Sequence, residues 1–151
     1  MRASRPIAGT PKRRGRHGVA ASELALILPL LLSVVLGAID LGRFAHTYIA
    51  VTNAARSGAG FAAMNSYTTT TKSVWDASLK QVVQDEMQQV IDDASGFSDS
   101  DLIVFANRSF DDGSLWRVRV DVTFPFETVV PWPTIPSVIN LQRTVEVRGI
   151  R

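Results

Sequence analysis

The stretch that decides the fold is LALILPLLLSVVLGAI, residues 24–39, which carries no charged side chain. As a helix with a rise of about 1.5 Å per residue, it covers roughly 24 Å, somewhat less than a bilayer core of about 30 Å. Beginning at Val19 extends the helix to roughly 31 Å, but it then places Glu23 inside the apolar layer. The pattern predicts one membrane span over residues 19–39.

Residues 1–18 form a basic leader before this span. Its six basic residues are accompanied by no acid, and they are Arg2, Arg5, Lys12, Arg13, Arg14 and Arg16. An excess of Lys and Arg on one flank keeps that flank in the cytoplasm. We therefore expect a cytoplasmic leader and an extracytoplasmic body. With the leader removed, the 16 basic residues fall to 10 against 14 acids. The body therefore carries no basic stripe for nucleic acid.

The apolar run also has some properties of a cleaved secretory signal. Its basic flank, its length and a cut after Ala38 would fit one, although Leu36 is large for such a site and Pro29 lies inside the run. Helical spacing, however, continues beyond the span at Phe44, Tyr48, Val51 and Ala55. We expect one helix from about Val19 to Met64, with residues 40–65 as a stalk.

Small side chains recur along one face of this stalk. Ala50, Ala54, Gly58 and Ala62 follow one another at every fourth position, which permits close approach of another backbone. Gly58 and Gly60 each weaken a helix by roughly 1 kcal/mol relative to alanine, so close packing must compensate. Two interpretations stay open: the face docks onto the protein's own domain, or it meets neighbouring copies or relatives in an assembly.

Residues 66–151 are predicted to form the extracytoplasmic domain. A polar run at residues 66–71 ends the first helix, and Ser73 with Asp76 resembles a capping box that opens a second one. Gly96 is the expected stop of this second helix. Its apolar face comprises Trp75, Leu79, Val82, Val83, Met87, Val90 and Ile91.

Strand patterns follow the second helix. Residues 102–106 are apolar, and residues 116–124 alternate apolar with polar side chains. Asp111-Asp112-Gly113 between them is a hairpin signal. Four prolines in residues 125–136 argue against a central strand and predict a loop, and residues 141–147 alternate again. We therefore expect an α+β fold, with a long N-terminal transmembrane and stalk helix, a second amphipathic helix and a small antiparallel β-sheet.

Several landmarks occur in a characteristic order over about residues 15–65. They are Gly18, Glu23, Pro29, Asp40-Leu41-Gly42-Arg43 and the run NAARSGA at residues 53–59. This combination resembles the TadE-like pseudopilin family of tight-adherence (Tad or Flp) pilus systems, which are related to type IV pili. Each landmark alone is a weak signal, and the specificity lies in the combination.

The resemblance implies processing and partners. In type IV prepilins a membrane-embedded peptidase cuts after the glycine, which here implies cleavage between Gly18 and Val19 and makes Glu23 the fifth residue of the mature chain. Leu24 stands where major Flp pilins carry an aromatic residue, and the soluble part is longer than theirs. The resemblance therefore implies a minor or accessory pseudopilin with a pilin-like fold.

The implied location is the bacterial inner membrane, with a single pass and a place in or at the base of a surface pilus. The implied partners are the prepilin peptidase, other pilins and pseudopilins, and the Tad inner-membrane assembly platform. The alternative is an uncleaved, membrane-anchored extracytoplasmic scaffold or interaction protein.

Glu23 has two interpretations. Cleavage would create a terminal ammonium group on Val19, and a carboxylate of an adjacent subunit could neutralise it within the apolar layer. Alternatively, Glu23 extends its carboxylate to the cytoplasmic interface, where its charge costs less.

The residues offer no site for chemistry, so we expect no enzyme activity, cofactor, metal or small-molecule substrate. His17 and His46 have no second ligand at useful spacing, and we find no nucleophile motif or phosphate-binding loop. An enzyme acting through uninterpreted loops is the weakest alternative. Several acids could in principle ligate calcium, but caps and turns explain them better; they are Asp92, Asp93, Asp99, Asp101, Asp111 and Asp112. The chain has no cysteine, so disulfides and thiol chemistry are excluded.

Overall fold

The computed structural model describes residues 17–94, 96–110 and 116–148. The basic leader before His17 and the predicted turn at Asp111-Asp112-Gly113 lie outside these residues. The chain divides into two units, residues 1–36 and residues 37–151. Each unit is described by itself.

Helix α1 (His17–Met64) passes through Pro29 without a break. This confirms the long N-terminal helix expected from Val19 to Met64. Every side chain from Gly18 to Leu36 is exposed, and the exposed fraction reaches 81% at Leu26. By length and composition, α1 is the one helix among the described residues that could cross a membrane.

Helix α2 (Lys72–Asp93) is amphipathic as predicted. Its buried side chains are Trp75, Leu79, Val83, Met87, Val90 and Ile91, whereas Val82 is only half-buried. Beyond its end, Gly96 has a φ of +89°, a conformation that favours glycine.

The predicted capping box at Ser73 and Asp76 is wrong, because α2 begins earlier, after Thr71. The Thr71 hydroxyl does not cap the helix and instead accepts a hydrogen bond from the backbone N–H of Thr68, at 2.9 Å. Asp76 pairs with Lys72 at 2.6 Å, so its carboxylate lies one turn inside the helix rather than at the cap.

Three antiparallel strands follow in the order β1-β2-β3. They are β1 (Ile103–Phe110), β2 (Trp116–Glu127) and β3 (Val138–Arg148). In the register, Val120 of the central strand lies opposite Ala106 on one side and Val145 on the other. Even-numbered side chains of β2 are buried throughout, whereas the odd-numbered ones are not. The α+β fold class is therefore confirmed.

Pro125 contradicts the expected loop, because it lies within β2. Pairing between β1 and β2 ends at Ile103 opposite Thr123, whereas Pro125 still pairs with Asn140 of β3. At this position β2 has a neighbour on one side only. Proline is tolerated where a strand is at an edge, so the loop begins after Glu127 instead.

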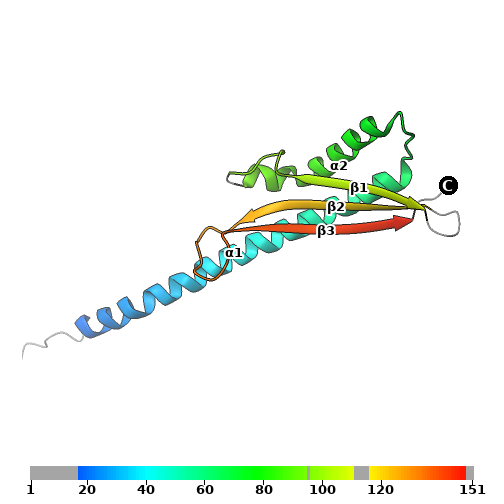
Figure 1. Cartoon of the computed structure of the whole chain (residues 1–151). Coiled ribbons are helices and arrows are strands. Elements are labelled where there is room, and N and C mark those ends of the chain that lie inside the picture. The colour runs from blue at the N-terminus through cyan, green and yellow to red at the C-terminus, as the bar shows by residue number, and fades with distance from the viewer. Residues whose placement is uncertain (1–16, 95, 111–115, 149–151) are drawn as a thin grey trace, which may run out of the picture. The chain divides into compact units, whose positions relative to one another are not determined.

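The core of the second unit lies between the two helices and the inner face of the sheet (Figure 1). The C-terminal half of α1 contributes Val51, Ala54, Ala55, Ala59 and Ala62, all fully buried. They pack with the apolar face of α2 and with the even-numbered residues of β2. This packing makes the C-terminal half of α1 part of the core of the second unit.

Candidate functional site

The predicted processing residues lie in the first turns of α1. A Cβ built on Gly18 would meet no atom within 4 Å, and Val19 is 61% exposed. The Ser22 hydroxyl donates to the carbonyl oxygen of Val19 at 2.8 Å, which is a local bond within the helix. Gly18 and Val19 are therefore both exposed on α1.

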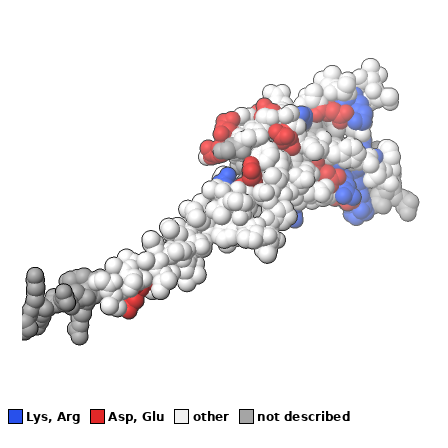
Figure 2. All heavy atoms as spheres, turned by 60° about the vertical axis from the view of Figure 1, so that its left-hand side comes forward, with Lys and Arg blue, Asp and Glu red and all other residues white. Residues whose placement is uncertain are grey.

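Glu23 carries the one charge between Gly18 and Ile39. Its side chain is exposed, among exposed apolar neighbours such as Leu24, at 59%, and Ile27, at 50%. This part of the helix is white in Figure 2 apart from one acidic patch, whereas charges gather on the domain. A carboxylate set in an apolar surface needs a cationic partner or access to water.

The face of α1 that carries Ala50, Ala54, Gly58 and Ala62 packs against the protein's own domain. Ala54 and Ala62 are fully buried, and Ala50 packs at the border of the core. A Cβ on Gly58 would stand 2.8 Å from Cγ2 of Val83 and 3.4 Å from Cγ1 of Val120. Of the two interpretations left open, the structure shows docking onto the protein's own α2 and β2. Other positions of this part of α1 stay exposed, among them Leu41 at 69% and Ile49 at 59%.

Asp40 makes structural contacts that the sequence did not predict. Its side chain is buried, with 6% of its surface exposed. Oδ1 accepts a hydrogen bond from the backbone N–H of Val129 at 2.8 Å. Oδ2 accepts bonds from Nε1–H of Trp132, at 3.2 Å, and from the N–H of Val130, at 3.4 Å. This carboxylate therefore ties α1 to the loop between β2 and β3.

Electrostatics keep Asp40 ionised. Burial alone would raise the pKa of this carboxyl group, but the hydrogen bonds from Val129, Trp132 and Val130 outweigh it. The nearby Arg43 guanidinium, at 3.7 Å, acts in the same direction. The pKa of Asp40 therefore lies below its ordinary value of 3.8.

Gly37 completes this anchor on the preceding turn of α1. The nearest ring atoms of Trp132 lie 3.7 Å from where a Cβ of Gly37 would stand. The partners of Asp40 are about 90 positions away in the chain. The only sequence signal was the Asp40-Leu41-Gly42-Arg43 landmark, which does not say what the acid contacts.

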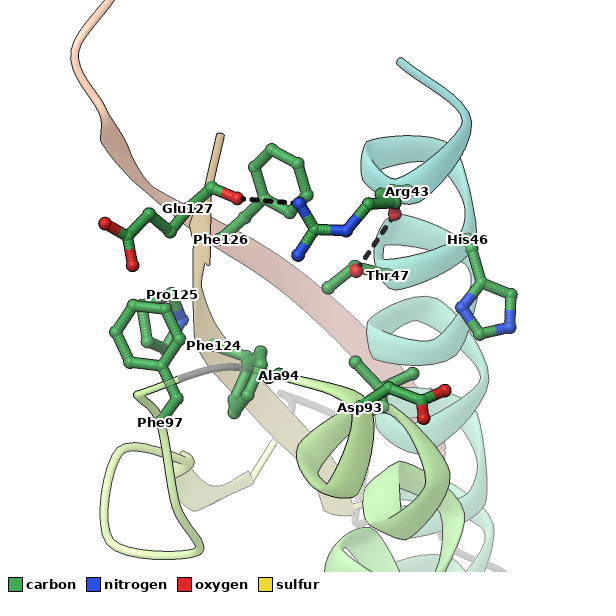
Figure 3. A pocket seen from close by; sticks show the side chains of 11 residues that line it. Arg43, His46, Thr47, Asp93, Ala94, Phe97, Phe124, Pro125, Phe126 and Glu127 are labelled. Carbon is green, nitrogen blue, oxygen red and sulfur yellow. Dashed lines mark hydrogen bonds between the residues drawn. The ribbon is translucent and has the colours of Figure 1, made fainter. Parts of the chain in front are cut away.

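A cavity of about 230 Å³ opens beside the anchor, between α1, the end of α2 and β2. Figure 3 shows Arg43 reaching across it from α1 toward Phe126 and Glu127. Its guanidinium donates to the Glu127 carbonyl oxygen at 3.4 Å and lies 5.7 Å from the Phe126 ring centroid. Thr47 donates to the Arg43 carbonyl oxygen at 3.0 Å. Arg43 thus links two elements across the cavity.

The remaining candidates for chemistry are dispersed. His46 and Asp93 line the cavity. Asp101 accepts hydrogen bonds from the backbone N–H and the hydroxyl of Ser98, and Asp92 accepts one from Gln88. In the part of the chain that the structure describes, no three His, Cys, Asp or Glu residues are grouped so that they could hold a metal ion. Asp111 and Asp112 lie outside the described residues.

In the comparison with protein families, the family model described as TadE-like protein matches residues 18–60. This segment of the chain is therefore similar to the TadE-like family. The match begins at Gly18 and includes Glu23, Asp40 and Gly58. Comparisons with curated proteins and with solved structures gave no significant match.

The similarity of residues 18–60 to the TadE-like family supports an association of this protein with a Tad pilus. The single apolar N-terminal helix fits a single-pass membrane protein in such a pilus system. The matched residues span α1 almost from its start to its last turn, so the resemblance rests on this helix and not on the sheet.

Proposed function

We propose that this protein is a minor or accessory pseudopilin of a Tad (Flp) pilus, cleaved after Gly18 and assembled through the N-terminal part of α1. The observation that carries the proposal is the contrast along one helix. From Gly18 to Leu36 every side chain is exposed, whereas Val51, Ala54, Ala55, Ala59 and Ala62 are fully buried in the domain.

This contrast has an energetic consequence. Burying a large aliphatic side chain is worth about 1.5–3 kcal/mol, so a helix surface made of many such side chains is unstable in water. The surface needs lipid or other apolar helices around it. A pilin exchanges the first environment for the second when it leaves the membrane and enters a filament, and this helix suits both.

Glu23 supplies specificity in this proposal. Cleavage after Gly18 exposes a terminal ammonium group on Val19, and the carboxylate of a neighbouring subunit neutralises it. A charge left unpaired in a low-dielectric layer costs several kcal/mol, so pairing favours one axial register between subunits.

The proposed location is the inner membrane, with the leader in the cytoplasm and the domain outside. The proposed partners are a prepilin peptidase, other pilins or pseudopilins, and the Tad assembly platform. We propose no enzymatic role, because the ionisable side chains around the cavity already hold structural contacts or stand apart. Cofactors and small-molecule substrates have no part in this function.

The test is co-expression of the full chain with a prepilin peptidase of a Tad system, followed by intact-mass measurement. We expect loss of residues 1–18 and an N-terminus at Val19. Gly18→Val should block this loss, because a branched side chain then occupies the position before the cleaved bond. Gly15→Val, three residues upstream in the same leader, is the matched control and should be cleaved.

A chain that keeps its leader beside an active peptidase would contradict the proposal. That result would instead support the uncleaved extracytoplasmic scaffold. Activity of the peptidase is established in the same cells with a pilin that it is known to process.

A further inference from the structure

The segment between β2 and β3, residues 128–137, is apolar and uncharged; we call it the Trp132 loop. No Asp, Glu, Lys or Arg occurs from Thr128 to Gln142. Val129 and Ile135 are 59% and 49% exposed, and Val138 directly after the loop is 49% exposed. Exposed apolar residues that lie together in an uncharged segment indicate a contact surface.

The place of this loop on α1 is fixed by contacts within the second unit. The Trp132 ring packs over Gly37, and Asp40 accepts hydrogen bonds from Val129, Val130 and Trp132. Residues 37–39 are the last of the apolar run. The loop therefore lies beside α1 at the level where the proposed membrane span ends.

Most positions of the loop have either no backbone N–H group or one that bonds within the protein. Its three prolines, Pro131, Pro133 and Pro136, have no N–H group to satisfy. Of the seven remaining N–H groups, four have partners within the protein. Those of Val129 and Val130 bond to Asp40, Thr128 donates to Ser137, and Ile135 donates to Trp132. With four of seven donors satisfied internally, the loop suits the partly hydrated interfacial layer and not the hydrocarbon core, where every donor needs a partner.

We propose that the Trp132 loop is a second membrane-contacting element, resting in the interfacial layer of the leaflet through which α1 leaves the bilayer. Tryptophan is enriched at this depth, where its ring meets acyl chains and its N–H finds a polar partner. Here Asp40 is that partner. The inference rests on the proposed membrane span and adds a second contact that this span does not require.

The absence of native cysteine allows a clean test with single cysteines in the full chain. Ile135→Cys reports on the loop, Leu31→Cys on the apolar span and Val74→Cys on an exposed position of α2. All three native side chains are at least 49% exposed. Each variant carries a polarity-sensitive fluorophore and is reconstituted in phosphatidylcholine–phosphatidylglycerol vesicles. The lipids carry a quencher either near the headgroups or near the acyl-chain ends.

We expect the emission maximum of the label at Ile135 to lie at shorter wavelength than that of the label at Val74. Its emission should be quenched mainly by the shallow quencher. The label at Leu31 should lose emission mainly with the deep quencher, and the label at Val74 with neither. If Ile135 behaves like Val74 while Leu31 is quenched, the loop inference fails and the span stands. If neither Ile135 nor Leu31 is quenched, the proposed span fails together with the inference.

A neighbouring subunit is the rival occupant of this surface. In that case the blue shift at Ile135 would grow with the protein-to-lipid ratio, and lipid quenchers would leave it unchanged. This outcome would overturn the membrane proposal. A blue shift that is independent of the protein-to-lipid ratio, together with shallow quenching, would support it.

Discussion

Asp40 is a buried anion that belongs to the fold of the domain. It lies one residue beyond the apolar run, yet three donors from a loop about 90 residues away converge on it. A buried carboxylate is favourable only when its hydrogen-bonding capacity is filled. Both carboxylate oxygens of Asp40 accept hydrogen bonds from the β2–β3 loop, so the residue fixes where this loop meets α1.

Asp40→Ala should lower the free energy of unfolding by about 1–3 kcal/mol, because the N–H of Val129 and Nε1–H of Trp132 lose their acceptor. Urea unfolding of the full chain in detergent micelles measures the change. Asp76→Ala removes a carboxylate from the exposed Lys72–Asp76 pair and is the matched control, with an expected change within about 0.5 kcal/mol. Equal losses in both variants would contradict the role assigned to Asp40.

The low pKa of Asp40 also predicts a pH dependence. A carboxyl group whose pKa is lower in the folded state stabilises the fold above its ordinary value of 3.8, and this contribution is lost as pH falls through the folded-state pKa. The stability difference between the natural chain and Asp40→Asn should therefore be constant near neutral pH and shrink in acid below that value. A difference that grows with acidification would contradict the assignment.

At the scale of elements, the joint between α1 and α2 depends on the missing side chain of Gly58. Val83 is β-branched and therefore rotationally restricted in a helix, so it cannot easily move away from an added methyl group. Its Cγ2 would lie 2.8 Å from a Cβ at position 58, whereas nothing lies within 4 Å of a Cβ at Gly60. Two glycines two positions apart thus differ in their packing demands.

Gly58→Ala should destabilise the protein by about 1–3 kcal/mol through overpacking, despite alanine's better helix propensity. Gly60→Ala should instead stabilise it by up to about 1 kcal/mol, because propensity acts there without a clash. Urea unfolding in micelles compares the two. Val83→Ala should cost less in the Gly58→Ala background than alone; the absence of such coupling would mean that the contact does not limit the packing.

The elements were predictable where their patterns are local. The helical spacing up to Met64 and the alternation from Trp116 to Phe124 both correspond to elements of the structure. Pro125 could not be placed from sequence, because its tolerance depends on where β1 stops pairing with β2. The contacts of Asp40 could not be predicted from sequence either, because its partners are about 90 positions away in the chain and approach it only in the folded structure.

At the scale of the whole molecule, Glu23 is the residue whose role extends beyond a single chain. Glu23→Ala, Glu23→Leu and Glu23→Gln should all be cleaved but enter pili at least several-fold less, because an unpaired ammonium in an apolar layer costs about 3–5 kcal/mol. The ratio of protein in sheared surface material to protein in membranes measures incorporation. Ser22→Ala, whose hydroxyl makes only a local helix bond, is the control. Normal incorporation of the Glu23 variants would remove this role.

In the proposed function, α1 becomes an assembly element once the leader is removed. N-terminal sequencing of the protein from native cells, in both the membrane fraction and sheared pili, tests it most directly. Protein in the sheared fraction should begin at Val19. Protein that begins at Met1 in both fractions would contradict it.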